Sequence, residues 1–204
     1  VHFKPESHIA GILLNACSEK LFRMLKPLLE TETGLPVRAL LRPRFGDFCY
    51  DRWELAQMAQ SAARLVEAGA DGIVTGVLTP EGDVDVEALQ PIYAAARAAA
   101  QRAGRPVACT LHRAFDVCRD PFAALEAARA LGLSTILTSG QAPSAPEGAA
   151  LLKRLVEAAG PELEILVGAG VTPENLPALA AATGARAFHL SGKRVLDSRM
   201  TFRR

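Results

Sequence analysis

The stretch VACTLHRAFD, from Val107 to Asp116, decides the fold of this chain, because it is a short apolar run that ends in polar and charged residues. Five other runs end in the same way, with helical patterns between them: VRALLRPR (37–44), GIVTGVLT (72–79), TILTSG (135–140), EILVGAG (164–170) and AFHLSG (187–192). Apolar strands that alternate with helices form parallel sheets buried on both faces. Since polar residues follow each strand, at the end where barrel proteins place their sites, we predict an α/β fold, a TIM-type (β/α) barrel.

The segments between the runs carry helix boundaries, and the number of runs limits the barrel. The helix after the first run is expected to begin at Asp51 and to end at Gly69, because Asp is favoured before a helix and Gly after one. In the helix after the second run, Pro91 is expected to mark a break or kink. Six strands are clear, and residues 9–17 fit either a seventh strand or a helix, whereas this barrel needs eight strands to close. We therefore expect one domain over residues 1–204, with a divergent segment 1–34 and six to seven βα units.

The composition limits the classes of function. The chain has 204 residues, half of them apolar, and a formal charge of +1, which predicts a sizeable core and gives no reason to expect a nucleic acid or a membrane as partner. No apolar run approaches the roughly 20 residues of a membrane span. The start VHFKPESHIAG has no apolar core of the signal-peptide type either, so we expect a cytoplasmic location. The cysteines form no CxxC pair, so we expect reduced thiols; they are Cys17, Cys49, Cys109 and Cys118.

Two histidines are expected to face the mouth of the barrel. Because side chains alternate along a strand, His112 should point inward with Thr110, and His189 with Ser191. Charged residues follow the same strands, and together these groups can bind a carboxylate or phosphate and transfer protons. We predict catalytic roles for His112, Arg113, Asp116 and His189, and anion binding by Arg42, Arg44, Asp47 and Ser191. Alternatively, a structural belt of ion pairs that holds the loops is formed by Arg42, Asp47, Arg113 and Asp116.

Three smaller residues complete the predicted anion site. Gly168 and Gly170 lie between a strand and a helix, where exposed backbone N–H groups can hold a phosphate. Ser139 places a hydroxyl beside the same mouth. A tight turn into the next helix is the alternative explanation of the two glycines.

Several strings resemble the CutC family, whose members are called copper homeostasis proteins. The resemblance runs from about Leu35 to the C-terminus and rests on strings such as LRPRFGDFCY, TLHRAFDVCRDPFAALE, ILTSGQ and TGARAFHLS. It implies a TIM barrel and a role in copper handling. The chain departs from the family at the first barrel units and at the expected mouth, where Phe45 replaces a Gly and Gly168-Ala169-Gly170 replaces three glycines.

The resemblance makes copper the expected cofactor or cargo. Cys109 should face the helices, whereas Cys49 and Cys118 follow strand ends and form the better copper-binding pair. We predict a copper homeostasis protein of CutC type that binds copper ion. The alternative is a TIM-barrel enzyme that acts on a small anionic or phosphorylated metabolite through the Arg/His/Asp groups, and whether the chain is an enzyme stays open.

An open barrel leaves the backbone of its edge strands unpaired. With six strands, those edges are 37–42 and 187–191. We expect the 9–17 stretch to pack into the gap and a homodimer to cover what remains.

Overall fold

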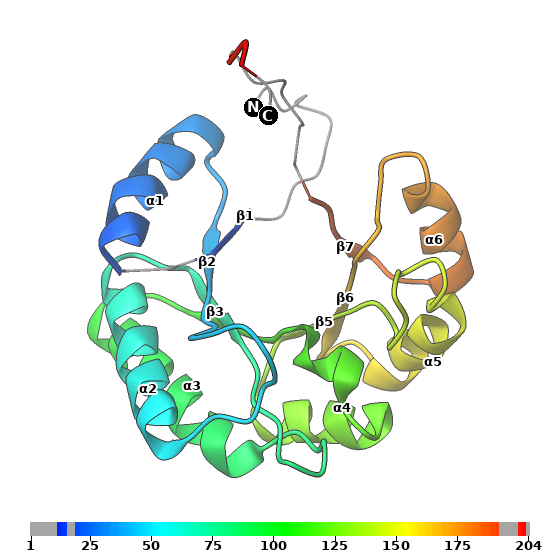
Figure 1. Cartoon of the computed structure of the whole chain (residues 1–204), viewed down its shortest axis with the longest axis horizontal. Coiled ribbons are helices and arrows are strands. Elements are labelled where there is room, and N and C mark those ends of the chain that lie inside the picture. The colour runs from blue at the N-terminus through cyan, green and yellow to red at the C-terminus, as the bar shows by residue number, and fades with distance from the viewer. Residues whose placement is uncertain (1–11, 16–18, 192–199, 203–204) are drawn as a thin grey trace.

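Seven parallel strands form one sheet in the computed structural model, which describes residues 12–15, 19–191 and 200–202. The strands follow chain order, each paired with the next: β1 (Ile12–Asn15), β2 (Val37–Leu40), β3 (Gly72–Thr75), β4 (Ala108–Leu111), β5 (Thr135–Thr138), β6 (Glu164–Gly168) and β7 (Ala187–His189). The sheet curls into an open arc with the helices outside it and with β1 and β7 at its two edges (Figure 1). The predicted incomplete TIM-type barrel is confirmed, with seven strands.

The uncertain stretch near the N-terminus contains a strand. Ile12–Asn15 forms β1, which pairs in parallel with β2 from Ile12↔Val37 to Asn15↔Leu40. The edge strand on this side is therefore β1 rather than β2, as expected if the 9–17 stretch packs into the gap.

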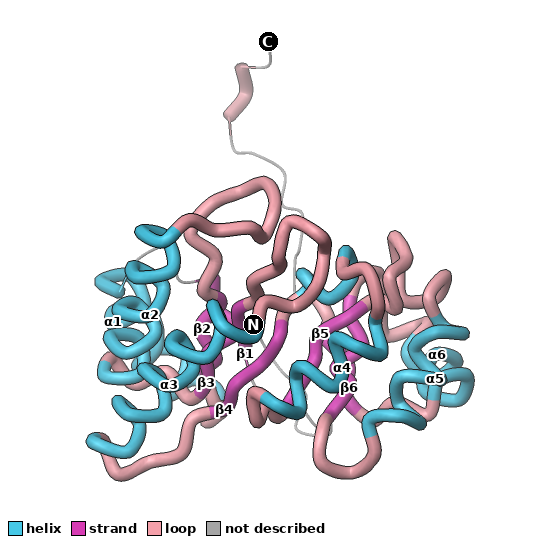
Figure 2. The backbone as a smooth tube through the Cα atoms, turned by 90° about the horizontal axis from the view of Figure 1, so that it is seen from below, coloured by secondary structure: helices cyan, strands magenta, loops and turns pink. Residues whose placement is uncertain are grey.

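Six α-helices and a short 3-10 helix connect the strands in the described part of the chain. They are α1 (Glu19–Thr33), α2 (Arg52–Glu67), α3 (Val86–Arg102), η1 (Arg113–Val117), α4 (Pro121–Ala130), α5 (Ala149–Ala159) and α6 (Leu176–Thr183). They flank the strands, and loops lie at both ends of the sheet (Figure 2). None of the helices in the described ranges has the length and apolar character that crossing a membrane would require.

The predicted helix boundaries are confirmed at Asp51 and Gly69. Asp51 caps α2, its side chain accepting from the backbone N–H of Glu54 while the Glu54 carboxylate accepts from the N–H of Asp51. Gly69 follows the helix with a φ of +103°, which favours glycine. A break or kink is expected at Pro91, and the break is wrong: α3 continues through this residue, because the loss of one N–H donor in its second turn is outweighed by burial of Ile92 and Tyr93.

The main core lies between the sheet and the helices. Ile73, Cys109, Leu111 and Val167 are buried in it, so the alternate residues of these strands face the inside of the barrel. Cys109 thus faces the helices, as predicted.

Candidate functional site

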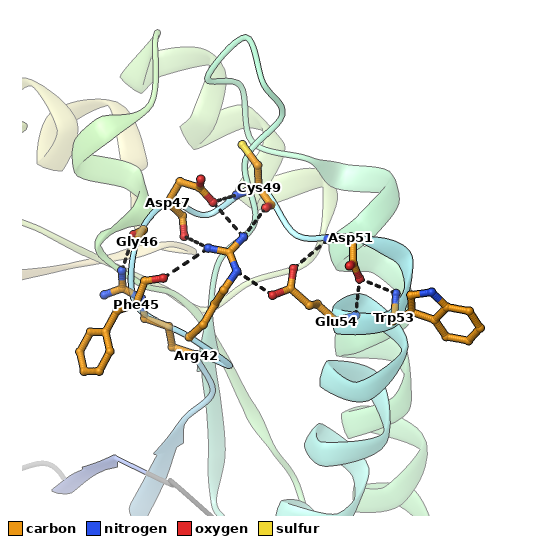
Figure 3. Close-up of polar contacts among 9 residues, drawn as sticks. Arg42, Phe45, Gly46, Asp47, Cys49, Asp51, Trp53 and Glu54 are labelled. Carbon is orange, nitrogen blue, oxygen red and sulfur yellow. Dashed lines mark hydrogen bonds and ion pairs between the residues drawn. The ribbon is translucent and has the colours of Figure 1, made fainter.

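The loop after β2 is fixed to α2 by Arg44. Its Nε lies 2.6 Å from Glu54 Oε1, one terminal nitrogen lies 3.0 Å from Asp47 Oδ1, and the same nitrogen donates to the Cys49 carbonyl at 2.7 Å. Hydrogen bonds to Glu54 and Asp47 raise the pKa of Arg44, and the Arg44 contact lowers the pKa of Asp47. In Figure 3 Asp47, Cys49 and Glu54 lie close together, while the ring of Phe45 points away from them. Arg44 and Asp47 are thus engaged in ion pairs within the protein, and anion binding by these two residues stays a prediction.

Asp116 organises the loop after β5. Its carboxylate accepts from Thr138 Oγ1 at 2.5 Å, from the Ser139 N–H at 2.9 Å and from Arg113 Nε at 2.7 Å. Its side chain is only 6% exposed. Ser139 in turn donates to the Ala142 carbonyl at 2.6 Å and accepts from Arg113 at 3.2 Å. This geometry favours a positioning role for Asp116. Both oxygens of its carboxylate already accept hydrogen bonds, so neither is free for the predicted catalytic role.

Arg113 and His189 are brought near each other from η1 and β7. His189 pairs with Gly168 in the sheet and lies on the inward side, opposite to its partly buried neighbour Phe188. Burial lowers the pKa of His189, and the positive charge of Arg113 lowers it further. The imidazole is therefore mainly neutral at pH 7 and able to accept a proton.

The glycines after β6 have packing explanations. A Cβ on Gly168 would lie 2.7 Å from Leu137 Cδ1, so the residue must be small. Gly170 has a φ of +70° and its carbonyl accepts from Asn175 Nδ2 at 2.8 Å. These contacts favour the tight-turn alternative, and anion binding by both glycines stays a prediction. Ser191, also predicted to bind an anion, is exposed after β7.

His112 is the most unusual polar side chain of the site. It is 4% exposed, and its Nδ1 accepts from the Ala114 N–H at 3.1 Å, which assigns the remaining proton of the neutral ring to Nε2. Nε2 is buried and has no hydrogen-bond partner in the described structure. Burial lowers the pKa of His112 to about 4, and the charge of Arg42 contributes. A Cβ on Gly76 would lie 2.6 Å from Nδ1, so this glycine makes room for the ring.

Phe48, in the loop after β2, joins His112 to Arg42, and Tyr50 in the same loop lies near Arg42. The Phe48 ring lies edge-to-face against the imidazole, with 5.0 Å between centroids, and Arg42 Cζ lies 4.6 Å above the centre of the Phe48 ring. Tyr50 Oη is the second buried polar side-chain atom that lacks a hydrogen-bond partner in the described residues. Burial raises the pKa of Tyr50, and the nearby charge of Arg42 opposes that shift without the geometry of a hydrogen bond.

Arg42 differs from three other arginines at this end of the sheet. Three of them form ion pairs with carboxylates: Arg44 with Asp47 and Glu54, Arg113 with Asp116, and Arg119 with Asp83. Within the described ranges no carboxylate pairs with Arg42, whose terminal nitrogen donates to the Gly46 carbonyl at 2.7 Å. We call Arg42, Phe48, Tyr50 and His112 the Arg42 cluster. It combines one uncompensated cation with two unpaired donors. Sequence reasoning found Arg42 and His112 but missed Phe48, Tyr50 and Gly76, although the two aromatics stand in the string RPRFGDFCY.

The predicted copper ligands are less well arranged. Cys118 is 7% exposed, its Sγ accepts from Gln141 Nε2 at 3.4 Å, and burial raises its pKa to about 11. Copper binds the thiolate, which such a buried thiol forms poorly. Cys49 is partly exposed. Over the described residues, no three His, Cys, Asp or Glu side chains cluster closely enough to hold a metal ion.

A cavity of about 700 Å³ lies at the opposite, amino-terminal end of the strands. Two arginines that line it are already engaged, since Arg97 donates to the Leu131 carbonyl at 2.8 Å and Arg105 to the Ala70 carbonyl at 2.8 Å. These contacts hold chain segments that follow helices, so Arg97 and Arg105 have structural roles.

Comparisons with known proteins agree with the fold. Residues 24–194 match the model of the CutC family. A CutC family protein of Chromobacterium violaceum is 48% identical over 171 residues, which are 84% of this chain and 66% of that protein. A human protein described as a copper homeostasis protein cutC homolog is 40% identical over 86% of this chain and 62% of its own length. The chain thus spans just under two thirds of the length of these relatives.

Solved structures give the same result. A CutC copper homeostasis protein of Streptococcus agalactiae has a TM-score of 0.76 and 32% identity, covering 84% of this chain and 80% of that one. A deoxyribose phosphate aldolase of Aeropyrum pernix, with a TM-score of 0.59, 14% identity and coverage of 88% and 82%, shares the fold alone. The chain belongs to the CutC family.

Proposed function

We propose that this CutC family chain binds a small anionic metabolite, a carboxylate or a phosphate, at the Arg42 cluster and acts on it as a TIM-barrel enzyme. One observation carries the proposal: Arg42 has no carboxylate partner in the described structure and stands beside two buried donors that also lack partners. A buried donor without a partner costs about 1–3 kcal/mol, so such groups are kept where something else satisfies them.

The chemistry of the cluster suits an oxyanion. Guanidinium, a phenol and a neutral imidazole N–H all donate hydrogen bonds, and charge-assisted hydrogen bonds to carboxylate or phosphate are the strong ones. His189 supplies a neutral base on the same inward face of the barrel, with Arg113 beside it. The Arg42 cluster would thus bind the anion, and His189 would transfer the proton.

The proposal is tested by thermal unfolding with phosphate and with acetate. A ligand at about 100 times its dissociation constant adds about 2.7 kcal/mol to the stability of the native state, which corresponds to a rise of several degrees in melting temperature for a chain of this size. Arg42→Ala should abolish the rise. Arg119→Ala is the matched control, because Arg119 is exposed and paired with Asp83. Failure of every anion in a panel to stabilise the parent protein would refute the proposal.

Copper binding is the second candidate function. The family description supports it, and the specific feature is the partly exposed Cys49 thiol. Under reducing conditions, a Cu(I) titration should lose its tightest phase in Cys49→Ser or in Cys118→Ser, whereas Cys109→Ser should mainly lower stability because that thiol is buried among the helices. Equal Cu(I) affinity in the three variants would exclude the pair.

Location and assembly are also proposals. A cytoplasmic location rests on the low density of cysteine and the absence of CxxC pairs. A homodimer rests on the two edges of the sheet, β1 and β7, which are not paired with each other in the described structure. Sedimentation velocity across a range of concentrations measures the assembly, and a monomer at all concentrations would exclude the dimer.

A further inference from the structure

The hydrogen-bonding state of His112 restricts the kind of atom that can meet it. Nδ1 is occupied by the N–H of Ala114, because His112 caps the start of η1. Gly76 packs directly against the ring, so a side chain there would displace it. The imidazole therefore presents Nε2–H, which donates and cannot accept.

The Nε2–H donor of His112 restricts which chemical group of a ligand can contact it. An ammonium group would be repelled by Arg42 and could not accept a hydrogen bond. A ligand hydroxyl could accept from Nε2–H, but its own proton would then need an acceptor, which neither Arg42 nor His112 offers. Tyr50 Oη could accept that proton, but the Tyr50 hydroxyl would then keep its own proton unpaired. A carbonyl oxygen accepts without bringing a proton, so it leaves no buried group unpaired.

Resting on the proposed function, we infer that the ligand is an oxo compound, a small carboxylate or phosphate ester whose carbonyl oxygen accepts a hydrogen bond from Nε2 of His112 while Arg42 holds the anionic group. A neutral imidazole in this position polarises the carbonyl and stabilises negative charge that develops on its oxygen. The low pKa of His112 keeps the ring in its donor form at neutral pH.

Phe48 lies between the two groups that would meet the ligand. Its ring contacts the imidazole of His112 and the guanidinium of Arg42, and Nε2 of His112 is itself buried. Phe48 thus links the residue proposed to hold the anion to the residue proposed to meet the carbonyl.

Two matched pairs of ligands test the inference by calorimetry. Pyruvate is compared with lactate, and dihydroxyacetone phosphate with glycerol 3-phosphate, so that each pair differs in oxo against hydroxyl and the pairs differ in the anion. In at least one pair we expect the oxo ligand to bind about tenfold more tightly or better, the effect of one well-made hydrogen bond. The pair that binds identifies the anionic group.

Two variants separate the functions of the ring. In His112→Asn the amide oxygen replaces Nδ1 and keeps the cap but loses the donor, so the preference for the oxo ligand should disappear. In His112→Gln the amide nitrogen replaces Nε2, so the preference should persist with a weaker cap. In the unchanged protein, the proton on Nε2 of His112 should shift downfield in NMR spectra with the oxo ligand and not with its hydroxyl partner.

The outcomes distinguish the two proposals. If the ligands bind through Arg42 with equal affinity for oxo and hydroxyl forms and no shift of the His112 proton, the inference is wrong and the anion site stands. If no ligand of either pair, nor phosphate or acetate, binds the parent protein, both are wrong.

Discussion

Arg44 and Arg42 lie in one loop but differ in whether a carboxylate compensates their charge. Arg44 contacts two carboxylates and a carbonyl, and its charge is compensated within the protein. Arg42, two residues earlier, stacks on Phe48 and pairs with no carboxylate in the described structure. Arg44 thus belongs to a structural network of ion pairs, whereas Arg42 keeps a positive charge without a carboxylate partner. Only an uncompensated charge of this kind favours the binding of an anion.

The largest loss of stability is expected when the Asp116 carboxylate, which accepts several hydrogen bonds, is removed. Asp116→Ala should lower the free energy of unfolding by about 3 kcal/mol or more, since Asp116 accepts from the buried Thr138 hydroxyl and the buried Ser139 N–H, and each buried donor left without an acceptor costs about 1–3 kcal/mol. Its loss deprives Arg113 and the Ser139 N–H of their acceptor. Urea denaturation measures the change. Asp47→Ala is the control, because Asp47 is 68% exposed and its loss should have little effect. Equal losses in the two variants would contradict the positioning role of Asp116.

The next prediction concerns how the stability of the protein depends on pH. The pKa of His112 is about 4 in the folded protein and 6.5 in the reference state. The unfolded chain therefore binds more protons between these values, and stability that is complete above about pH 6.5 is lost as the pH falls toward 4. The linkage amounts to about 3 kcal/mol. The free energy of unfolding, measured by urea denaturation from pH 7 to pH 4, should fall less with decreasing pH for His112→Asn than for the parent. An equal fall in the two proteins would show that His112 titrates normally.

A smaller effect is expected at Ala169. This residue has a φ of +73°, in the left-handed region that a side chain disfavours. Ala169→Gly should raise stability by about 1 kcal/mol, unless the greater freedom of glycine in the unfolded chain cancels part of the gain. Ala98→Gly, at an exposed position inside α3, should instead lower stability by about 1 kcal/mol. A loss in both variants would contradict backbone strain at Ala169.

Much of the fold could be predicted from sequence, because strand and helix signals are local. The six apolar runs became β2 to β7, and the helix boundary at Asp51 followed from its cap. Pro91 was misjudged because the local penalty of proline is outweighed by core packing that the sequence pattern does not display.

The site was harder to predict, because pairing depends on loop geometry. RPRFGDF contains two arginines and one aspartate, and nothing in the string says which arginine takes Asp47. The answer depends on Glu54, which lies in the first turn of α2, where its carboxylate caps the helix and also binds Arg44. Likewise, the role of Gly76 follows from its approach to His112, which alternation along a strand does not reveal.

The most direct measurement of the central claim is the free energy of unfolding of Arg42→Gln and Arg44→Gln, each with and without a saturating anion such as phosphate. If Arg42 is the uncompensated anchor, Arg42→Gln should keep the stability of the ligand-free parent and lose the increment from the anion, while Arg44→Gln should be less stable alone and keep that increment. The reverse pattern, with the increment retained in Arg42→Gln and lost in Arg44→Gln, would contradict the account.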